Sequence, residues 1–209
     1  MMFTRVCIVG PKGVGKTSIA ARIDDASLSS QKSATGTMFT TCNVLVRERT
    51  LSLEILDISG EEKLRCMGPI YYKEAKAALC VFDLTSEKTL ESLSLWIDSI
   101  RNNACEECQV IILGNKVDLE DLRQVSKDRA KKYADSVGAK YFEVSSVTGV
   151  GLLTVVIYLS KHILYWSDCS STYAAKRSII SNSIEYISPK KEVKKRRFSF
   201  PIRRLSLLS

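Results

Sequence analysis

Apolar and polar residues alternate along the chain with two different periods. Short, nearly continuous apolar runs at residues 5–9, 77–83 and 109–114 are typical of strands that are covered on both faces. Between the last two runs, apolar residues recur at helical spacing and predict a helix over residues 87–102. Strands and helices therefore follow one another in this part of the chain.

Six further segments complete the predicted order of elements. We expect strands at residues 42–47, 51–57 and 140–144, and helices at residues 16–23, 126–136 and 151–166. Strands separated by helices imply right-handed crossovers and a mostly parallel sheet. The sequence therefore predicts an α/β fold, a six-stranded sheet with helices on both faces and with ligand-binding loops at the carboxyl ends of the strands.

Charge divides the chain into two parts. The 209 residues are 45% hydrophobic and 26% charged, which is ordinary globular composition, and their formal net charge is +8. Residues 176–209 hold ten basic and two acidic residues, so they carry the whole excess. A neutral body argues against a nucleic-acid-binding domain, because such a domain would carry a patch of basic residues on its own surface. We expect a folded domain at residues 1–166 and a flexible basic-hydrophobic tail at residues 167–209.

Targeting signals and cysteines point to the cytosol. No apolar run reaches the roughly 18 residues that span a bilayer, and we expect no signal peptide. The seven cysteines are odd in number and scattered, which favours reduced thiols. Cys105 and Cys108 have metal-ligand or redox spacing, but there is no second such pair and His162 is the one histidine. This composition disfavours a zinc site.

The first chemical signature lies at residues 10–17, between the first predicted strand and helix, and fits G-x-x-x-x-G-K-[ST]. Glycines here let backbone N–H groups approach phosphate oxygens, and the helix N-terminus adds the positive end of its dipole. We expect Lys16 to reach the β- and γ-phosphates and the Thr17 hydroxyl to bind Mg²⁺. The residues expected at the phosphates are Gly10, Lys12, Gly13, Val14, Gly15, Lys16, Thr17 and Ser18.

The second signature is Asp57 with Gly60, directly after a predicted strand. An aspartate there can hold Mg²⁺ through a water, and the Gly60 N–H can reach a γ-phosphate. This pattern alone is also typical of a simple turn. Its position one hairpin after the phosphate loop favours the metal site.

The third signature concerns the nucleotide base. Asp118 follows a strand and can accept hydrogen bonds from the N1–H and exocyclic amino groups of guanine, a pair that adenine does not offer. We expect Lys116 to cover the base and Asn115 to tie this loop to the phosphate loop. Backbone N–H groups around Ser145 and Ser146 would meet the guanine O6.

These motifs, in this order over residues 4–166, resemble the Ras superfamily of small GTPases, which has a P-loop NTPase fold. Residues 71–75, residues 81–85 and Trp96 look most like the Rab branch. The resemblance implies a monomeric GTP/GDP switch in membrane traffic with bound Mg²⁺. It also implies loops that respond to the γ-phosphate, and an exchange factor, an activating protein and effectors as partners. Thr35 would join Thr17 and Asp57 on the metal, although counting back from Phe39 selects Ala34 instead.

Two departures from the family fall at positions that do chemistry. Glu61 replaces the glutamine that orients the attacking water, and its carboxylate has no amide N–H to donate and repels the γ-phosphate. Lys12 replaces a small residue; it would obstruct an activating protein's arginine, offer its own cation to the γ-phosphate, or point into water. With Lys16 and Glu61 as the catalytic candidates, we expect guanine nucleotide binding with slow hydrolysis.

Two other functions compete with this interpretation. A hydrolysis-deficient pseudo-GTPase would act as a GTP-loaded scaffold, which the same two departures favour. A P-loop ATPase or nucleotide kinase would not need the base-recognition signature at residues 115–118.

The tail has no cysteine after Cys169, so we expect no prenylation. Basic and apolar residues interleave at residues 190–208, a composition that can bind an anionic membrane surface. We expect a peripheral location on the cytosolic face of endomembranes or the plasma membrane. A nuclear localisation signal, a calmodulin-type target or a solvated end are the alternatives. Ser199 and Ser206 follow paired arginines, and phosphorylation there would weaken lipid binding.

Overall fold

The computed structural model of the protein describes residues 2–25, 39–46, 49–58 and 71–182. Its strands are β1 (Met2–Val9), β2 (Phe39–Val46), β3 (Arg49–Asp57), β4 (Ala75–Asp83), β5 (Gln109–Asn115) and β6 (Lys140–Glu143). Its helices are α1 (Lys16–Asp25), α3 (Glu87–Glu91), α4 (Leu93–Asn103), the 3-10 turn η2 (Glu120–Leu122), α5 (Lys127–Ser136) and α6 (Leu152–Asn182).

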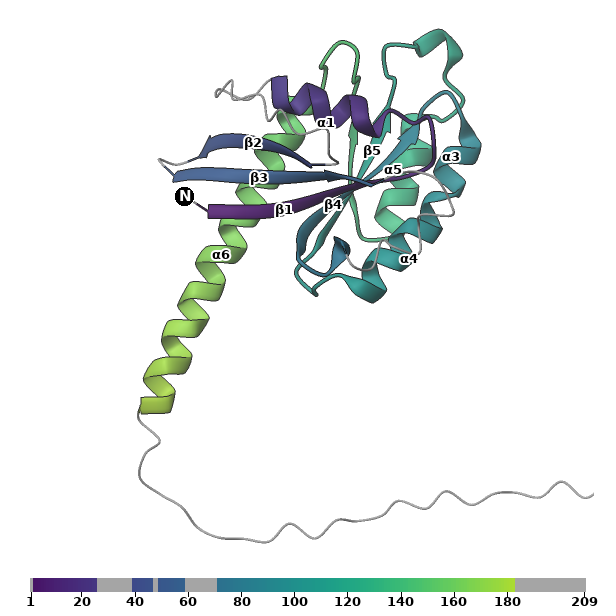
Figure 1. Cartoon of the computed structure of the whole chain (residues 1–209). Helices are drawn as coiled ribbons and strands as arrows, with labels where there is room; N and C mark the ends of the chain where they lie inside the picture. The colour runs from purple at the N-terminus through teal and green to yellow at the C-terminus, as the bar shows by residue number, and fades with distance from the viewer. Residues whose placement is uncertain (1, 26–38, 47–48, 59–70, 183–209) are drawn as a thin grey trace, which may run out of the picture. The chain divides into compact units, whose positions relative to one another are not determined.

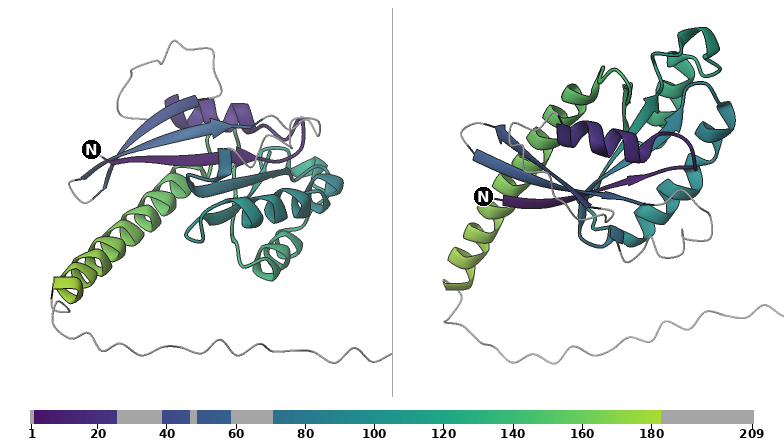
Figure 2. Two further views of the ribbon diagram at one scale, coloured as in Figure 1. Left: turned by 60° about the horizontal axis from the view of Figure 1, so that its bottom comes forward. Right: turned by 45° about the horizontal axis from the view of Figure 1, so that its top comes forward.

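The strands form one six-stranded sheet in the order β2-β3-β1-β4-β5-β6 (Figure 1). Only the pair formed by β2 and β3 is antiparallel. Figure 2 shows this pair beside β1. The other neighbouring strands are parallel. The predicted mostly parallel, six-stranded α/β architecture is confirmed.

Two hydrophobic cores lie on the two faces of the sheet. One joins the sheet to α1 and α6, through residues such as Ile19, Ile23 and Val155. The other joins it to α3, α4 and α5, through Leu90 and Trp96 among others. Figure 1 shows α3, α4 and α5 grouped on the side of the sheet away from α1. Because both faces are covered, the central strands can be apolar throughout, as β4 is.

The predicted helix over residues 87–102 is two helices, because α3 ends at Glu91 and α4 begins at Leu93. The Ser92 hydroxyl donates to the Thr89 carbonyl over 3.0 Å, a local bond that competes with the helical ladder. Leu90 and Leu93 are both buried, so the hydrophobic face continues across the break. The apolar spacing therefore predicted the buried face and missed the interruption.

The last helix is longer than predicted. We expected a helix to residue 166 followed by a flexible tail, whereas α6 continues to Asn182. Residues 167–182 contain neither glycine nor proline, so nothing in the sequence stops the helix there. By internal contacts, the chain separates into two compact units, Met1–Cys169 and Ser170–Ser209. None of the helices within the described ranges has the length and apolar character to cross a membrane.

Candidate nucleotide-binding site

The predicted site residues lie at one edge of the sheet because parallel strands end there together. Strand β1 ends at Val9, beside β3, in a register that pairs Ile8 with Asp57. Strand β4 ends beside β5, in a register that pairs Asp83 with Asn115. The turns that follow these strands therefore start next to one another, which is the usual position of ligands in open α/β sheets.

Two glycines of the phosphate loop are required by their surroundings. Gly10 has a φ of +140°, and a Cβ there would lie 2.1 Å from the carbonyl oxygen of Val81. Gly15 has a φ of +92°, and a Cβ there would lie 2.3 Å from the Asn115 side-chain nitrogen. The loop can pass this close to β4 and to Asn115 only because these positions lack side chains.

Lys16 begins α1 and is only 6% exposed. Its Nζ donates to the Pro11 carbonyl oxygen over 2.7 Å, so the side chain folds back over the loop. Burial lowers the pKa of Lys16, and the nearby Asp57 carboxylate opposes that shift. An ammonium held in a partly dry loop interacts strongly with an anion, since little water screens it.

Thr17 and Asp57 come from different elements and meet in the structure. The Thr17 hydroxyl donates to Oδ2 of Asp57. The other carboxylate oxygen, Oδ1, is buried without a hydrogen-bond partner among the described residues. A hydroxyl and a carboxylate are oxygen donors of the kind that Mg²⁺ prefers, and the orphaned oxygen leaves room for such an interaction. These residues therefore fit a Mg²⁺ site.

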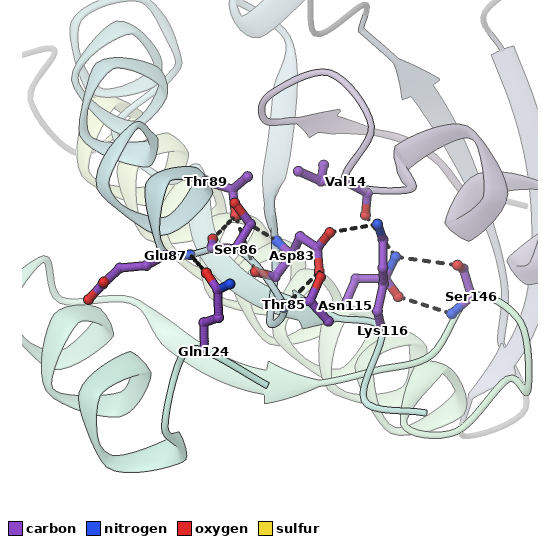
Figure 3. Close-up of polar contacts among 10 residues, drawn as sticks. All are labelled: Val14, Asp83, Thr85, Ser86, Glu87, Thr89, Asn115, Lys116, Gln124 and Ser146. Atoms are coloured by element: carbon purple, nitrogen blue, oxygen red, sulfur yellow. Dashed lines mark hydrogen bonds and ion pairs between the residues drawn. The ribbon is translucent and has the colours of Figure 1, made fainter. Parts of the chain in front are cut away.

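Asn115 joins three loops and is fully buried. Its Nδ2 donates to the Val14 carbonyl oxygen over 2.8 Å and to the Ser146 hydroxyl over 3.3 Å. Its Oδ1 accepts from the Ser146 backbone N–H over 3.0 Å (Figure 3). The predicted link between the base loop and the phosphate loop is present, and the same side chain also holds the loop after β6.

Lys116 is the one residue with a side chain and a positive φ, +70°, among those described. Its Nζ forms an ion pair with Oδ2 of Asp83 over 2.6 Å, as Figure 3 shows. The other oxygen of Asp83 accepts from the backbone N–H and hydroxyl of Thr85, over 2.8 and 2.7 Å. Burial alone would raise the pKa of Asp83, but the bonds with Lys116 and Thr85 lower it overall. Asp83 is absent from the predicted site residues because only the adjacent ends of β4 and β5 reveal its role.

A second ion pair joins the segment after η2 to the end of β6. Arg123 follows η2, and its two terminal nitrogens donate to the two carboxylate oxygens of Glu143 over 3.1 and 3.2 Å. Glu143 is the last residue of β6, immediately before the loop that carries Ser145 and Ser146. Within that loop the buried Ser145 hydroxyl accepts from the backbone of Thr148 over 3.0 Å. Arg123 was also outside the predicted site.

The remaining predicted residues divide into exposed and undescribed positions. Lys12, Gly13, Thr17, Ser18 and Asp118 are exposed at this edge of the sheet. Thr35, its alternative Ala34, Gly60 and Glu61 lie outside the described residues, as do the tail positions 190–208 with Ser199 and Ser206. The structure thus brings together the phosphate loop, Asp57 and the loops that follow β5 and β6.

Comparison with known proteins gives consistent matches over the same region. The model of the Ras family matches residues 5–165. The Ras-related protein Rab-22A of Mus musculus is 35% identical over 160 residues, covering 76% of this chain and 82% of the relative. Rab-12 of Rattus norvegicus is 31% identical over 191 residues, covering 90% and 77%. Rab-21 of Bos taurus is 32% identical over 161 residues, covering 77% and 72%.

Proposed function

The chain belongs to the Ras family and is Rab-like, and from that premise we propose that it is a guanine-nucleotide switch that hydrolyses GTP slowly. The observation that carries the proposal is the Asn115 side chain, which holds the phosphate loop at Val14 and the base loops at Ser146 together. One buried amide therefore fixes the positions of the loops that would contact the phosphates and the base of a nucleotide. Preorganised loops of this kind lower the cost of binding.

The phosphate end of the site is formed by the loop after β1 and the first turn of α1. Backbone N–H groups from Gly13 to Lys16 would donate to phosphate oxygens, with the helix dipole adding attraction. The Lys16 ammonium would exchange the Pro11 carbonyl for the β- and γ-phosphates. Thr17 and Asp57 would hold Mg²⁺, which neutralises phosphate charge when bound.

The base end of the site depends on Asp118. Its carboxylate would accept both donors of guanine, while Lys116, held by Asp83, would lie along the base. Asp118 is exposed without a ligand, so the bound base itself would cover its carboxylate; adenine would then leave the carboxylate without partners, which is costly. The backbone of the loop at Ser145 and Ser146 would complete the contact to O6.

The chemistry of hydrolysis is where this chain differs from its family. A glutamine at position 61 would both accept from the attacking water and donate to the transition state, whereas Glu61 can only accept and carries negative charge toward the phosphate. The exposed Lys12 lies on the same loop as Lys16 and would partly offset this charge or impede an incoming arginine. These two residues also favour the second candidate function, a GTP-loaded scaffold that does not hydrolyse.

Single-turnover hydrolysis of a purified Mg²⁺·GTP complex tests the proposal. We expect a slow rate that Glu61→Gln raises by about tenfold or more, because the variant regains an amide donor to the transition state. Glu62→Gln is the matched control, since it removes the neighbouring charge without restoring the amide at position 61. No hydrolysis in either protein would support the scaffold, and a fast rate in the unmodified protein would contradict the role of Glu61.

Switching would pass to partners through the loops near the γ-phosphate, and the tail would provide the membrane contact. The similar proteins carry Rab names. These names support the proposal that this chain acts in membrane trafficking, with an exchange factor, an activating protein and effectors as partners. The six basic residues within 190–197 would be attracted to an anionic leaflet, and the apolar residues that follow would insert.

Vesicle sedimentation tests the tail. We expect the full chain to bind vesicles that contain anionic phospholipid and to lose most binding when Lys194, Lys195, Arg196 and Arg197 are replaced by serine. Replacement of the exposed Lys131 and Lys132 on α5 is the control for charge removal elsewhere. Binding that does not respond to lipid charge would exclude this contact. Phosphorylation of Ser199 and Ser206 should weaken it.

A further inference from the structure

The connection between α4 and β5 brings two cysteines into one tight turn, at residues 105–108. The Cys108 backbone N–H donates to the Cys105 carbonyl oxygen over 2.9 Å, which is the closing bond of a four-residue β-turn. Such a turn holds its first and last Cα atoms within about 7 Å of each other. Disulfide-bonded cysteines have Cα atoms about 4.4–6.8 Å apart, so this backbone needs little change to accept the bond.

Cys105 is half-buried, and a cation lies beside its sulfur. Its thiol donates to the Ala75 carbonyl oxygen over 3.4 Å, and the Lys76 ammonium lies 3.9 Å from the sulfur. Lys76 also pairs with Glu107 over 2.6 Å, and this hydrogen bond, with Cys105 contributing, raises the pKa of Lys76. The lysine is therefore charged at neutral pH, and its ammonium is the cation beside the Cys105 sulfur.

Cys108 has a different environment. It packs against the core between the sheet and α4, and burial raises its pKa to about 12. It is therefore a protonated thiol at neutral pH and reacts slowly by itself. The two sulfurs thus differ in the way that a reactive cysteine and its resolving partner differ.

From this juxtaposition we propose that Cys105 and Cys108 are a redox modification site that forms a reversible disulfide with a hydroperoxide as oxidant. The Cys105 sulfur attacks one peroxide oxygen and becomes a sulfenic acid, while the other oxygen leaves as water or an alcohol. The Cys108 thiol then attacks the Cys105 sulfur, and its proton leaves with the hydroxyl group as a second water. Two electrons pass from the two thiols to the peroxide, and a small thiol reductant reverses the bond.

This site is independent of the proposed nucleotide chemistry, because it lies in the connection that precedes β5 whereas the base loop follows β5. The chain offers no third ligand for a metal there: within the described part, no group of three or more His, Cys, Asp or Glu side chains is arranged to hold an ion. Disulfide formation needs only the two sulfurs and an oxidant.

Peptide mass mapping of the full chain tests the proposal. After treatment with hydrogen peroxide, alkylation and trypsin digestion, residues 102–116 form one peptide with no other cysteine. We expect this peptide to escape alkylation and to weigh about 2 Da less than the dithiol, with dithiothreitol restoring it. Two alkylated thiols, at peroxide levels that oxidise free cysteine, would overturn the proposal. So would disulfides from this peptide to Cys66 or Cys169.

Two variants separate the roles of the groups. Cys108→Ser should stop the reaction at a sulfenic acid on Cys105 that dimedone traps. Lys76→Gln should slow oxidation by about three- to tenfold, because the cation beside Cys105 is removed. Lys131→Gln, on α5, is the matched control and should react at the unmodified rate. Equal oxidation rates in the unmodified chain, Lys76→Gln and Lys131→Gln would exclude a role for Lys76. A Cys108→Ser variant that forms no dimedone adduct would overturn the order of attack.

Discussion

Asp83 and Lys116 form an ion pair within the candidate site, and the sequence analysis predicted only Lys116. The Asp83 side chain is 10% exposed and that of Lys116 is 31% exposed, so the pair is partly shielded from water. Pairs of this kind depend strongly on both partners, since removal of one leaves a poorly solvated charge. We therefore propose that Asp83 is a positioning residue that would orient Lys116 toward the base.

The first prediction concerns this pair. Asp83→Asn should speed the release of a fluorescent GDP analogue by about 5- to 20-fold, because Lys116 loses its charge-assisted bond. The control is Asp98→Asn on α4, an exposed carboxylate remote from the base loops. Unchanged release from the Asp83 variant would show that Lys116 is oriented without this bond.

The second prediction compares two glycines of the phosphate loop. Both have positive φ, but a Cβ at Gly10 collides with the Val81 backbone whereas a Cβ at Gly13 meets nothing within 4 Å. Gly13→Ala should lower the free energy of unfolding by about 1 kcal/mol through strain alone. Gly10→Ala should lower it by about 3 kcal/mol or more, because the loop must also move. Urea unfolding measures both values, and equal losses would contradict the close approach of the loop to β4.

At the scale of elements, one face of α6 places a histidine between two aromatic side chains. Tyr158, His162 and Trp166 are four residues apart, with ring centroids 6.4 and 6.2 Å from the histidine ring. Nε2 of His162 is buried without a hydrogen-bond partner among the described residues, and burial lowers the pKa of the side chain. The neutral imidazole is therefore the form that fits this position.

The third prediction is a pH dependence of stability. Because the folded pKa of His162 lies below the ordinary value of 6.5, its contribution is fully present above that value and is lost as pH falls toward the folded pKa. Urea unfolding at about pH 7.5 and about pH 5.5 should show a loss that His162→Phe reduces. His162 is the only histidine, so its NMR titration can be followed directly. A midpoint at or above 6.5 would contradict its burial.

The elements also show what the sequence could and could not predict. Strands such as β4 and β5 were predicted because burial on both faces leaves a continuous apolar run. The loops after β1 and β5 were predicted because their chemistry requires glycine, lysine or a carboxylate at fixed spacing. The start of β1 at Met2 was missed, because pairing with β3 from Leu51 onward extends the strand beyond the continuous apolar run. The break at Ser92, whose hydroxyl bonds the Thr89 carbonyl, leaves the buried face continuous, so the apolar spacing does not reveal it.

Contacts between distant residues explain the rest of the site. Asp83 and Lys116 are far apart in sequence, as are Arg123 and Glu143, and each pair meets because the sheet brings strand ends together. Asn115 was predicted to tie two loops, yet its bonds to Ser146 depend on where β6 ends. Single-sequence patterns identify residues that do chemistry by type; they do not identify the residues that hold them in place.

At the scale of the whole molecule, we propose separate tasks for a neutral nucleotide-binding body and a basic tail. The tail carries the entire +8 excess, whereas the site depends on partly buried groups in the body. Salt should therefore weaken the vesicle binding of the full chain more strongly than its nucleotide binding, because exposed charges are screened and buried ones much less. Sedimentation and nucleotide titration at low and high salt check this, and parallel losses would contradict the division.

Nucleotide selectivity tests the central claim most directly. Nucleotide-stripped protein, titrated with fluorescent GDP and competed with unlabelled GDP or ADP in the presence of Mg²⁺, should prefer GDP by at least about 10³-fold. The reason is that Asp118 has two donors to accept from guanine and none of that pair from adenine. Equal competition by ADP would contradict the account, because the phosphate loop alone does not distinguish the two bases.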